Sequence, residues 1–169
     1  MAKTSYAVAL GSNRRHGRHG NPARVLEAAA AALDASGIEL SAVSRIRDTP
    51  AMGPAGRGFA NAAALIETEL EPTDLLCALK ETERAFGRRP GRKWGPRVLD
   101  LDIILWSGGA WGEHGLIVPH PAFRERRFVL APLAEIVPEW RDPLTGATVR
   151  QLLHRCGKRR PVDRTARPT

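Results

Sequence analysis

The chain has 169 residues, which is enough for one domain with a single core. Hydrophobic residues make up 43% and charged residues 26%, which excludes a disordered chain, and the apolar runs are too short to cross a bilayer. The net charge of +8 raises the question of nucleic-acid binding, but part of this charge lies in the tail over residues 158–169. We expect a single domain over residues 1–157, followed by a disordered, solvated tail.

The start of the chain and its cysteines bear on the cellular compartment. Residues 1–5 lead directly into a strand-like segment, without the apolar region of a signal peptide. The only cysteines are Cys77 and Cys156, each inside a helical pattern, and both are interpreted as reduced thiols. We therefore expect a cytoplasmic protein.

Apolar periodicity and turn residues divide the chain into regular elements. Asn21-Pro22 is typical of a helix start, and Gly87 is typical of a helix end. The patterns predict, in chain order, a strand over 5–11, a helix over 22–36, a strand over 38–46, a loop over 47–58, a strand over 59–70, a helix over 72–86 and a strand over 98–105.

This order predicts the fold. A β-α-β-β-α-β succession is typical of an α+β, ferredoxin-like core, in which two helices pack on one face of an antiparallel sheet. A C-terminal extension follows the core. We expect it to hold a glycine-rich hairpin near 107–112, a helix over about 127–136 and a short helix over about 149–156.

The segment Asp100-Leu101-Asp102 is the most informative local feature. Residues two apart on a strand point the same way, so both carboxylates share one face, which continues with Ile104 and Trp106. The opposite face is expected to carry four apolar side chains, Leu99, Leu101, Ile103 and Leu105. Neighbouring carboxylates repel unless a cation lies between them, and two Mg²⁺ ions about 3.5–4 Å apart would suit this pair and a polyphosphate. The alternative is a half-exposed strand whose aspartates pair with nearby arginines.

Other local features allow more than one interpretation. The Gly-Pro turn in Trp94-Gly95-Pro96-Arg97 would bring a guanidinium close to the carboxylates, where it could hold a phosphate oxygen. Phe59 and Asn61 share a strand face, so a flat ring could stack on one and hydrogen-bond the other, although Phe59 taken alone is interpreted as a core residue. In isolation, Gly11-Ser12-Asn13 is interpreted as a simple turn and His120 as a structural residue. Zinc spacings, a serine-hydrolase motif and the G-x-x-x-x-G-K-[ST] loop do not occur.

Five ordered segments together resemble the 6-hydroxymethyl-7,8-dihydropterin pyrophosphokinase family, over about residues 6–153. The segments are Ala9-Leu10-Gly11-Ser12-Asn13, Thr49-Pro50…Gly53-Pro54, Phe59-Ala60-Asn61-Ala62, Trp94-Gly95-Pro96-Arg97-Val98-Leu99-Asp100-Leu101-Asp102-Ile103 and Pro119-His120-Pro121…Arg126-Arg127-Phe128-Val129-Leu130. The resemblance implies an ATP- and magnesium-dependent enzyme of folate biosynthesis. It would transfer pyrophosphate from ATP to the hydroxymethylpterin and release AMP.

The resemblance also implies roles for individual residues. Asp100 and Asp102 would hold two Mg²⁺ ions, and Arg88 and Arg97 would stabilise the transferred charge. The pterin would be bound by Thr49, Pro50, Met52, Phe59, Asn61 and Phe128. ATP would be bound by Lys80, Glu83, Lys93, Trp94, Ile103, His120 and Arg126.

The sequence departs from the family pattern in three places. Lys80 stands where the family often has glutamine, and Pro90 stands where a second arginine is frequent, a role that Arg89 or Arg92 could take over. The basic loop over residues 14–20 has no assigned function.

Two alternatives remain open from the residues alone, an RNA-binding ferredoxin-like module and a relative that binds ligand without turnover. Aromatic residues make up only 5%, which disfavours the first alternative. Only the altered loop over residues 88–92 favours the second. We expect a monomer that acts on small molecules and binds neither nucleic acid nor membrane.

Overall fold

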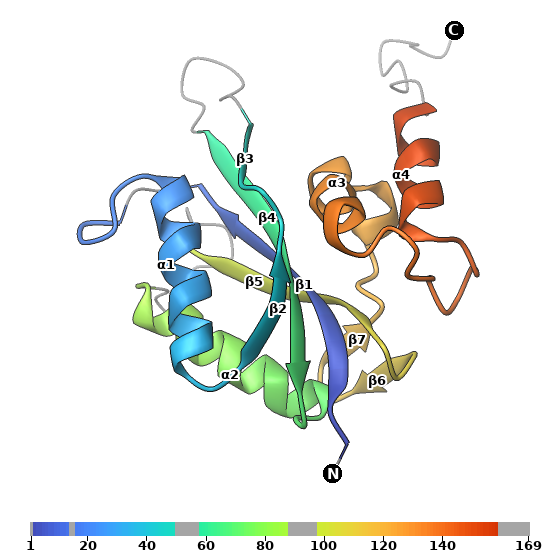
Figure 1. Cartoon of the computed structure of the whole chain (residues 1–169), viewed down its shortest axis with the longest axis horizontal. Helices are drawn as coiled ribbons and strands as arrows, with labels where there is room; N and C mark the ends of the chain where they lie inside the picture. Colours follow the sequence, from blue (N-terminus) through green and yellow to red (C-terminus); the bar gives the residue numbers. More distant parts are fainter. Residues whose placement is uncertain (1, 14–15, 50–57, 88–97, 159–169) are drawn as a thin grey trace, which may run out of the picture.

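The computed structural model describes residues 2–13, 16–49, 58–87 and 98–158. These residues form an α+β fold (Figure 1). In chain order the elements are β1 (Thr4–Ser12), α1 (Pro22–Ala35), β2 (Glu39–Val43), β3 (Arg47–Thr49), β4 (Phe59–Thr68), α2 (Pro72–Ala85), β5 (Asp100–Trp106), β6 (Trp111–Glu113), β7 (Leu116–Val118), the 3₁₀ turn η1 (Phe123–Glu125), α3 (Arg127–Ile136) and α4 (Val149–Lys158). The predicted tail begins inside α4, because Lys158 is its last residue, and residues 159–169 lie outside the described part.

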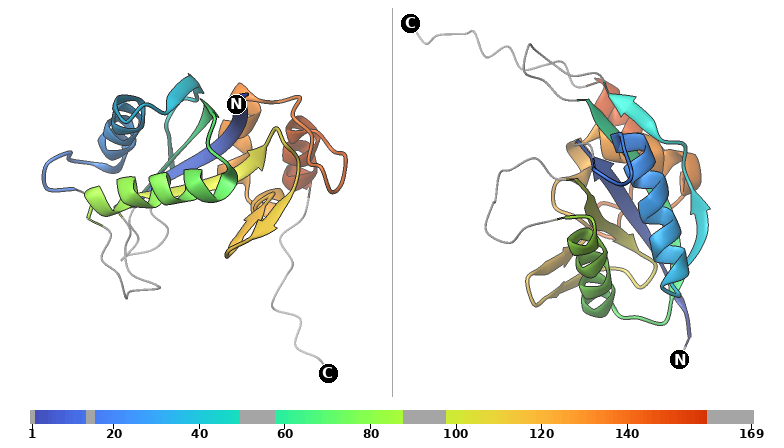
Figure 2. Two further views of the ribbon diagram at one scale, coloured as in Figure 1. Left: turned by 90° about the horizontal axis from the view of Figure 1, so that it is seen from below. Right: turned by 90° about the vertical axis from the view of Figure 1, so that its left-hand side faces the viewer.

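The main sheet has the strand order β2-β4-β1-β5, with β3 also paired to β4, and every pairing in it is antiparallel. This arrangement confirms the predicted ferredoxin-like core. One apolar cluster fills the space between the sheet and helices α1 and α2, and a second cluster lies between the opposite face and helices α3 and α4. Figures 1 and 2 show these two layers of helices on either side of the sheet.

The central strand β1 shows why the sequence supports both layers. Its side chains alternate across the sheet, so that Tyr6 and Val8 join the α1–α2 cluster while Ala7 and Ala9 face α3. The small side chains on the second face let α3 pack closely against β1 and β4. The predicted start of α1 is confirmed, because the side chain of Asn21 accepts a hydrogen bond from the Arg24 amide at 3.0 Å.

Strand β3 corrects the predicted loop over residues 47–58. Arg47 pairs with Asn61 and Thr49 with Phe59, so the first three residues of that segment are a strand. Strand β4 is twice as long as β2, with 10 residues against 5, and β3 pairs with the part of β4 that β2 does not reach. Thr49 precedes a proline, which disfavours helix and favours this extended conformation.

A β-bulge in β5 corrects the predicted faces of that strand. The register with β1 shifts so that Ile104 is an additional residue, and Ile104 and Leu105 both join the cluster beneath α3. Trp106 packs instead with the α1–α2 cluster. The predicted alternation therefore holds through Ile104 and is wrong for Leu105 and Trp106, because one inserted residue reverses the faces of those that follow.

The predicted hairpin near residues 107–112 lies a few residues later in the chain. Residues 107–109 form a tight turn that closes with a bridge between Trp106 and Gly109. The paired strands are β6 and β7, and the residues between them, His114 and Gly115, both have positive φ, at 52° and 76°. Two positive φ values are the signature of a type I′ turn, which asparagine and glycine usually mark, so a histidine in the first position concealed it.

The connection between α3 and α4 turns around the carboxylate of Asp142, which is 0% exposed. Its two oxygens accept hydrogen bonds from Arg124 Nε and Nη2 at 2.5 and 2.9 Å, from the Leu144 amide at 3.0 Å and from the Thr145 hydroxyl at 2.7 Å. Burial alone would raise the pKa of this carboxyl. The hydrogen bonds from Arg124, Thr145 and Leu144 outweigh that effect and lower the pKa of Asp142 from 3.8 to about 2.

This lowered pKa predicts a loss of stability in acid. The pKa of Asp142 is depressed in the folded state, so the ionised carboxylate stabilises the fold above about pH 4, and this contribution disappears as the pH falls toward 2. The contribution is on the order of 2 kcal/mol. Thermal unfolding of the wild type and of Asp142→Asn, which cannot titrate, should therefore differ at pH 5 and converge toward pH 2. A stability difference that does not change with pH would contradict the assignment.

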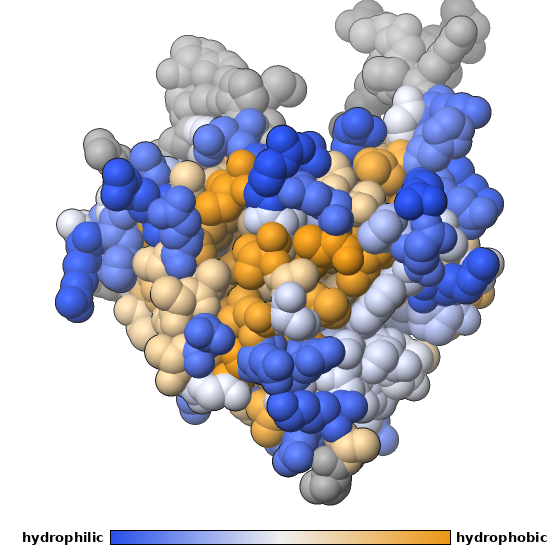
Figure 3. Space-filling model, in the orientation of Figure 1, coloured by the Kyte–Doolittle hydropathy of each residue, from blue (hydrophilic) through white to orange (hydrophobic). Residues whose placement is uncertain are grey.

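Apolar side chains are exposed beside the β2 edge of the sheet. Figure 3 shows an apolar strip on this side of the molecule between helices α1 and α3, and Val43 on β2 is 47% exposed.

Within the described ranges, no helix combines the length and the apolar character needed to span a membrane.

Candidate functional site

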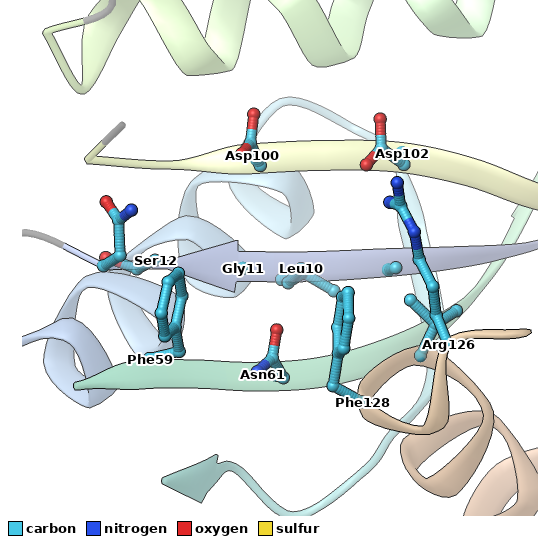
Figure 4. A pocket seen from close by; sticks show the side chains of 12 residues that line it. Leu10, Gly11, Ser12, Phe59, Asn61, Asp100, Asp102, Arg126 and Phe128 are labelled. Atoms are coloured by element: carbon cyan, nitrogen blue, oxygen red, sulfur yellow. The ribbon is translucent and has the colours of Figure 1, made fainter. Parts of the chain in front are cut away.

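A pocket of about 230 Å³ opens on the α3 face of the sheet, where β1 and β4 meet the start of β5 (Figure 4). It is lined from three strands, from the residue that follows β1 and from the start of α3. The lining residues are Ala9, Leu10, Gly11, Ser12, Asn13, Phe59, Asn61, Asp100, Asp102, Arg126, Phe128 and Val129. The structure thus brings together residues that the sequence analysis placed in separate motifs.

The register of the three strands places the polar groups of the pocket in rows. Gly11 of β1 lies directly between Asn61 of β4 and Asp100 of β5, and Ala9 lies opposite Asp102. A Cβ atom on Gly11 would lie 3.4 Å from the Asn61 Oδ1 atom and 4.0 Å from the Asp100 Cβ atom. The glycine therefore keeps the floor of the pocket open between an amide and a carboxylate.

The predicted carboxylate pair is confirmed as a geometric feature. Asp100 and Asp102 extend from β5 in the same direction in Figure 4, and both line the pocket. Carboxylate oxygens are the ligands that Mg²⁺ prefers, and this ion commonly takes only one or two of them and completes its shell with water and phosphate oxygens. In the described part of the chain, no three His, Cys, Asp or Glu side chains gather as a metal site. Two aspartates at the rim of an open pocket fit a magnesium ion shared with a polyphosphate better than an ion held by protein alone.

Two aromatic rings stand on either side of Asn61. Phe59 comes from β4 and Phe128 from α3, and Figure 4 shows them as facing walls with the amide between them. Their exposed fractions are 48% and 50%, which is high for phenylalanine, so neither ring is a core residue. The interpretation of Phe59 as a core residue is therefore wrong. The Arg126 guanidinium lies 5.7 Å from the centre of the Phe128 ring and extends toward Asp102. Two flat apolar walls with an amide between them suit a planar heteroaromatic ligand.

His120 lies close to the acidic and basic ends of the pocket. Burial lowers its pKa, Asp102 opposes this by raising the pKa, and Arg126 lowers it further, so the ring is neutral at neutral pH. Its Nδ1 atom accepts a hydrogen bond from the Ala122 amide at 3.2 Å. The proton of the neutral ring is therefore on Nε2, which makes Nε2 the donor atom of the ring.

Four described residues predicted to bind ATP are not part of the pocket lining; they are Lys80, Glu83, Ile103 and, although it lies near Asp102 and Arg126, His120. Glu83 is 2% exposed, and its carboxylate accepts a hydrogen bond at 2.9 Å from the amide of Leu101 on β5. Ile103 is also 2% exposed, so its side chain belongs to the core and only its main chain could meet a ligand. Lys80 is exposed on α2. Glu83 therefore supports the edge strand that carries the aspartates.

Several predicted site residues cannot be placed. Thr49 is described only as the last residue of β3, beside Phe59. The remaining predicted residues lie outside the described ranges; they are Pro50, Met52, Arg88, Lys93, Trp94 and Arg97.

The structure adds Gly11 and Ser12 to the site. Strand β1 continues through Ser12, so the predicted strand end at Gly11 is one residue short and a simple turn at Ser12 is wrong. Gly11 lies within the strand, and Ser12 is 3% exposed at the edge of the pocket. The resemblance included this segment, but only strand pairing shows that the glycine separates Asn61 from Asp100.

Comparison with known proteins gives a consistent result. Residues 7–138 match the model of the family described as 7,8-dihydro-6-hydroxymethylpterin-pyrophosphokinase (HPPK). Proteins named 2-amino-4-hydroxy-6-hydroxymethyldihydropteridine pyrophosphokinase are 41% identical over 148 residues in Methylorubrum extorquens (86% of this chain and 89% of the relative) and 40% identical over 154 residues in Pseudomonas aeruginosa (88% and 90%). The relative of the same name from Synechocystis is 41% identical over 118 residues, which are 70% of this chain and 60% of that protein.

A solved structure shares the fold. The crystal structure of an HPPK-DHPS protein in complex with substrates superposes with a TM-score of 0.71 at 11% identity, over 92% of this chain and 45% of that chain. The chain therefore spans less than half of that larger protein, and at this identity the likeness concerns the fold alone. The family match over most of the chain, with relatives near 40% identity, shows that this chain belongs to the 7,8-dihydro-6-hydroxymethylpterin-pyrophosphokinase (HPPK) family, the ATP-using pyrophosphokinases of folate synthesis.

Proposed function

We propose that this chain transfers the β,γ-pyrophosphoryl group of ATP to the hydroxymethyl oxygen of 6-hydroxymethyl-7,8-dihydropterin and releases AMP. The observation that carries the proposal is the single pocket in which Asp100 and Asp102 lie one strand away from Asn61 and its two aromatic walls. One half of this pocket suits a flat ring, and the other half suits a metal-bound polyphosphate. The reaction needs both ligands side by side.

The pterin is proposed to lie between Phe59 and Phe128. Stacking between two rings removes both faces of the pterin from water, and the Asn61 amide can donate to and accept from the edge of the ring. Gly11 leaves room for the ring to reach the floor of the sheet. Thr49, Pro50 and Met52 are proposed to meet the remaining edge of the pterin, because β3 ends beside Phe59.

Asp100 and Asp102 are proposed to hold two Mg²⁺ ions together with the triphosphate. Magnesium bound there would neutralise phosphate charge and lower the pKa of the pterin hydroxyl. The two aspartates fix where the triphosphate lies relative to the attacking oxygen. Such positioning is most of what phosphoryl-type transfer requires of a protein.

Cationic and donor groups around the carboxylates are proposed to bind the rest of ATP. Arg126 and the Nε2–H group of His120 can donate to phosphate or sugar oxygens. Arg88 and Arg97 are proposed to stabilise the transferred charge, and they belong to the segment that joins α2 to β5 directly before Asp100. The other residues proposed for the ATP site are Lys80, Glu83, Lys93, Trp94 and Ile103, of which Glu83 would act by supporting β5 and Ile103 through its main chain.

The alternative of an RNA-binding module finds no support in the geometry. Ferredoxin-like RNA-binding sheets stack bases on aromatic side chains of the open sheet face. Here that face is covered by α3 and α4, and the central strand β1 presents Ala7, Ala9 and Gly11 on it. Of the two exposed rings at the pocket, only Phe59 belongs to the sheet, because Phe128 belongs to helix α3.

The proposed setting is a monomer in the cytoplasm. Cys77 and Cys156 are both free cysteines in the structure, which fits a reducing compartment.

The test is the release of AMP from ATP and magnesium, with and without 6-hydroxymethyl-7,8-dihydropterin. AMP should form only with the pterin, and removing magnesium with a chelator should stop it. The matched control is 6-methyl-7,8-dihydropterin, which fills the same pocket but has no attacking oxygen and should give no AMP. A folded protein that binds both ligands without releasing AMP would instead be the non-catalytic relative considered above.

A further inference from the structure

We propose that the buried ion pair between Arg124 and Asp142 positions the wall of the pocket formed by Arg126 and Phe128. Arg124 and Asp142 are then positioning residues for substrate binding. Neither Arg124 nor Asp142 lines the pocket. The inference rests on the proposed function, because it assigns these residues to the binding of the same substrates. It does not require that they touch either substrate.

The geometry of the pair is that of a rigid anchor. Arg124 meets both oxygens of Asp142 through Nε and Nη2, a bidentate arrangement that fixes the plane of the guanidinium relative to the carboxylate. Each oxygen accepts one further hydrogen bond, from the Leu144 amide or the Thr145 hydroxyl. The carboxylate thus has two donors on each oxygen, which fills its acceptor capacity and leaves it one orientation.

A short, ordered path leads from this anchor to the pocket. Arg124 lies in the turn η1, whose first residue, Phe123, is 0% exposed in the cluster beneath α3. The Arg126 amide donates to the Phe123 carbonyl at 3.2 Å, and the Arg126 carbonyl then accepts the Leu130 amide at 2.9 Å. Phe128 follows in the first turn of α3. Arg126 lies two positions after Arg124 in the chain, and Phe128 lies four positions after it.

The start of α3 needs such an anchor. Its N-cap residue, Arg126, makes no side-chain capping hydrogen bond, so the helix start is not fixed in the usual way. The Phe128 side chain is 50% exposed and therefore is not fixed by a surrounding core. The position of this ring then depends on the backbone just before it, which the pair between Arg124 and Asp142 fixes.

The experiment uses Arg124→Lys, which keeps the charge but cannot form the bidentate fork. The Michaelis constants for ATP and for the pterin should each rise about tenfold while kcat changes by less than about twofold, because the wall is displaced but the carboxylates are not. Direct titration with the fluorescent ligand 6-hydroxymethylpterin should show weakening of about the same size, and it needs no turnover. A failure of the proposed activity is therefore distinguishable from a failure of this inference.

Two further variants complete the test. Thr145→Val removes a single hydrogen bond to Asp142 and should raise the Michaelis constants for ATP and for the pterin by a smaller factor. This variant tests the proposal if Arg124→Lys does not fold. Arg150→Ala is the matched control, because Arg150 lies on α4 and forms an exposed ion pair with Glu139 in the same α3–α4 connection, so its loss should change neither constant. A lower melting temperature with unchanged Michaelis constants and pterin affinity would show that the pair is only structural and would overturn the proposal.

Discussion

Asp100→Asn and Asp102→Asn are each expected to lower kcat by at least about 10³-fold while pterin affinity changes little. Asparagine preserves the shape of the side chain but removes the charge that a magnesium ion requires. The pterin walls come from β4 and α3, whereas the aspartates come from β5, so binding of the ring should survive. Single-turnover rates at saturating magnesium, together with a pterin titration, separate the two effects.

The control for this pair is Asp34→Asn, which removes one negative charge from an exposed position near the end of α1. Its kcat should equal that of the wild type. If either Asp100→Asn or Asp102→Asn kept near-normal turnover at saturating magnesium, the assignment of the carboxylates to the metal would be wrong.

Gly11→Val is expected to abolish pterin binding without destabilising the fold. The first side-chain carbon would lie 3.4 Å from the Asn61 Oδ1 atom, and the two methyl groups beyond it would occupy the floor of the pocket. Gly11 does not have a positive φ, and valine favours strands, so the substitution should be tolerated by β1. Pterin affinity should fall at least about 100-fold, whereas Gly11→Ala should have an intermediate effect.

Gly112→Val provides the matched control for this substitution. Gly112 lies in strand β6, and a Cβ atom there would meet no described atom within 4 Å. Both valine variants should melt at or above the wild-type temperature, and only the variant at Gly11 should lose the pterin. Normal pterin binding by a folded Gly11→Val protein would show that the ring does not lie over β1.

Local patterns were sufficient for the core of the fold and for much of the site. Strand-like apolar segments located β1 and β4, the Asn21 cap located α1, and the two-residue spacing placed Asp100 and Asp102 on one face. These features depend on residues close together in the chain. The same spacing rule correctly placed Phe59 and Asn61 on a shared face.

The remaining features depend on pairing between distant segments. The β-bulge at Ile104 arises where β5 meets β1, and the strand β3 forms because β4 extends beyond β2. The bulge has no signal within its own residues, and in β3 the proline after Thr49 favours an extended conformation without predicting a strand partner. The pair between Arg124 and Asp142 joins residues 18 positions apart, one before α3 and one after it. Their side chains meet only when the α3–α4 connection folds back onto η1.

The identity of the reaction product tests the central claim most directly. Phosphorus NMR of a reaction with ATP, magnesium and 6-hydroxymethyl-7,8-dihydropterin should show AMP together with a pterin ester that carries two coupled phosphorus atoms. This product requires that the β,γ-pyrophosphoryl group moves as one unit to the hydroxymethyl oxygen. ADP with a pterin monophosphate, or phosphorus signals unaffected by the pterin, would contradict the account.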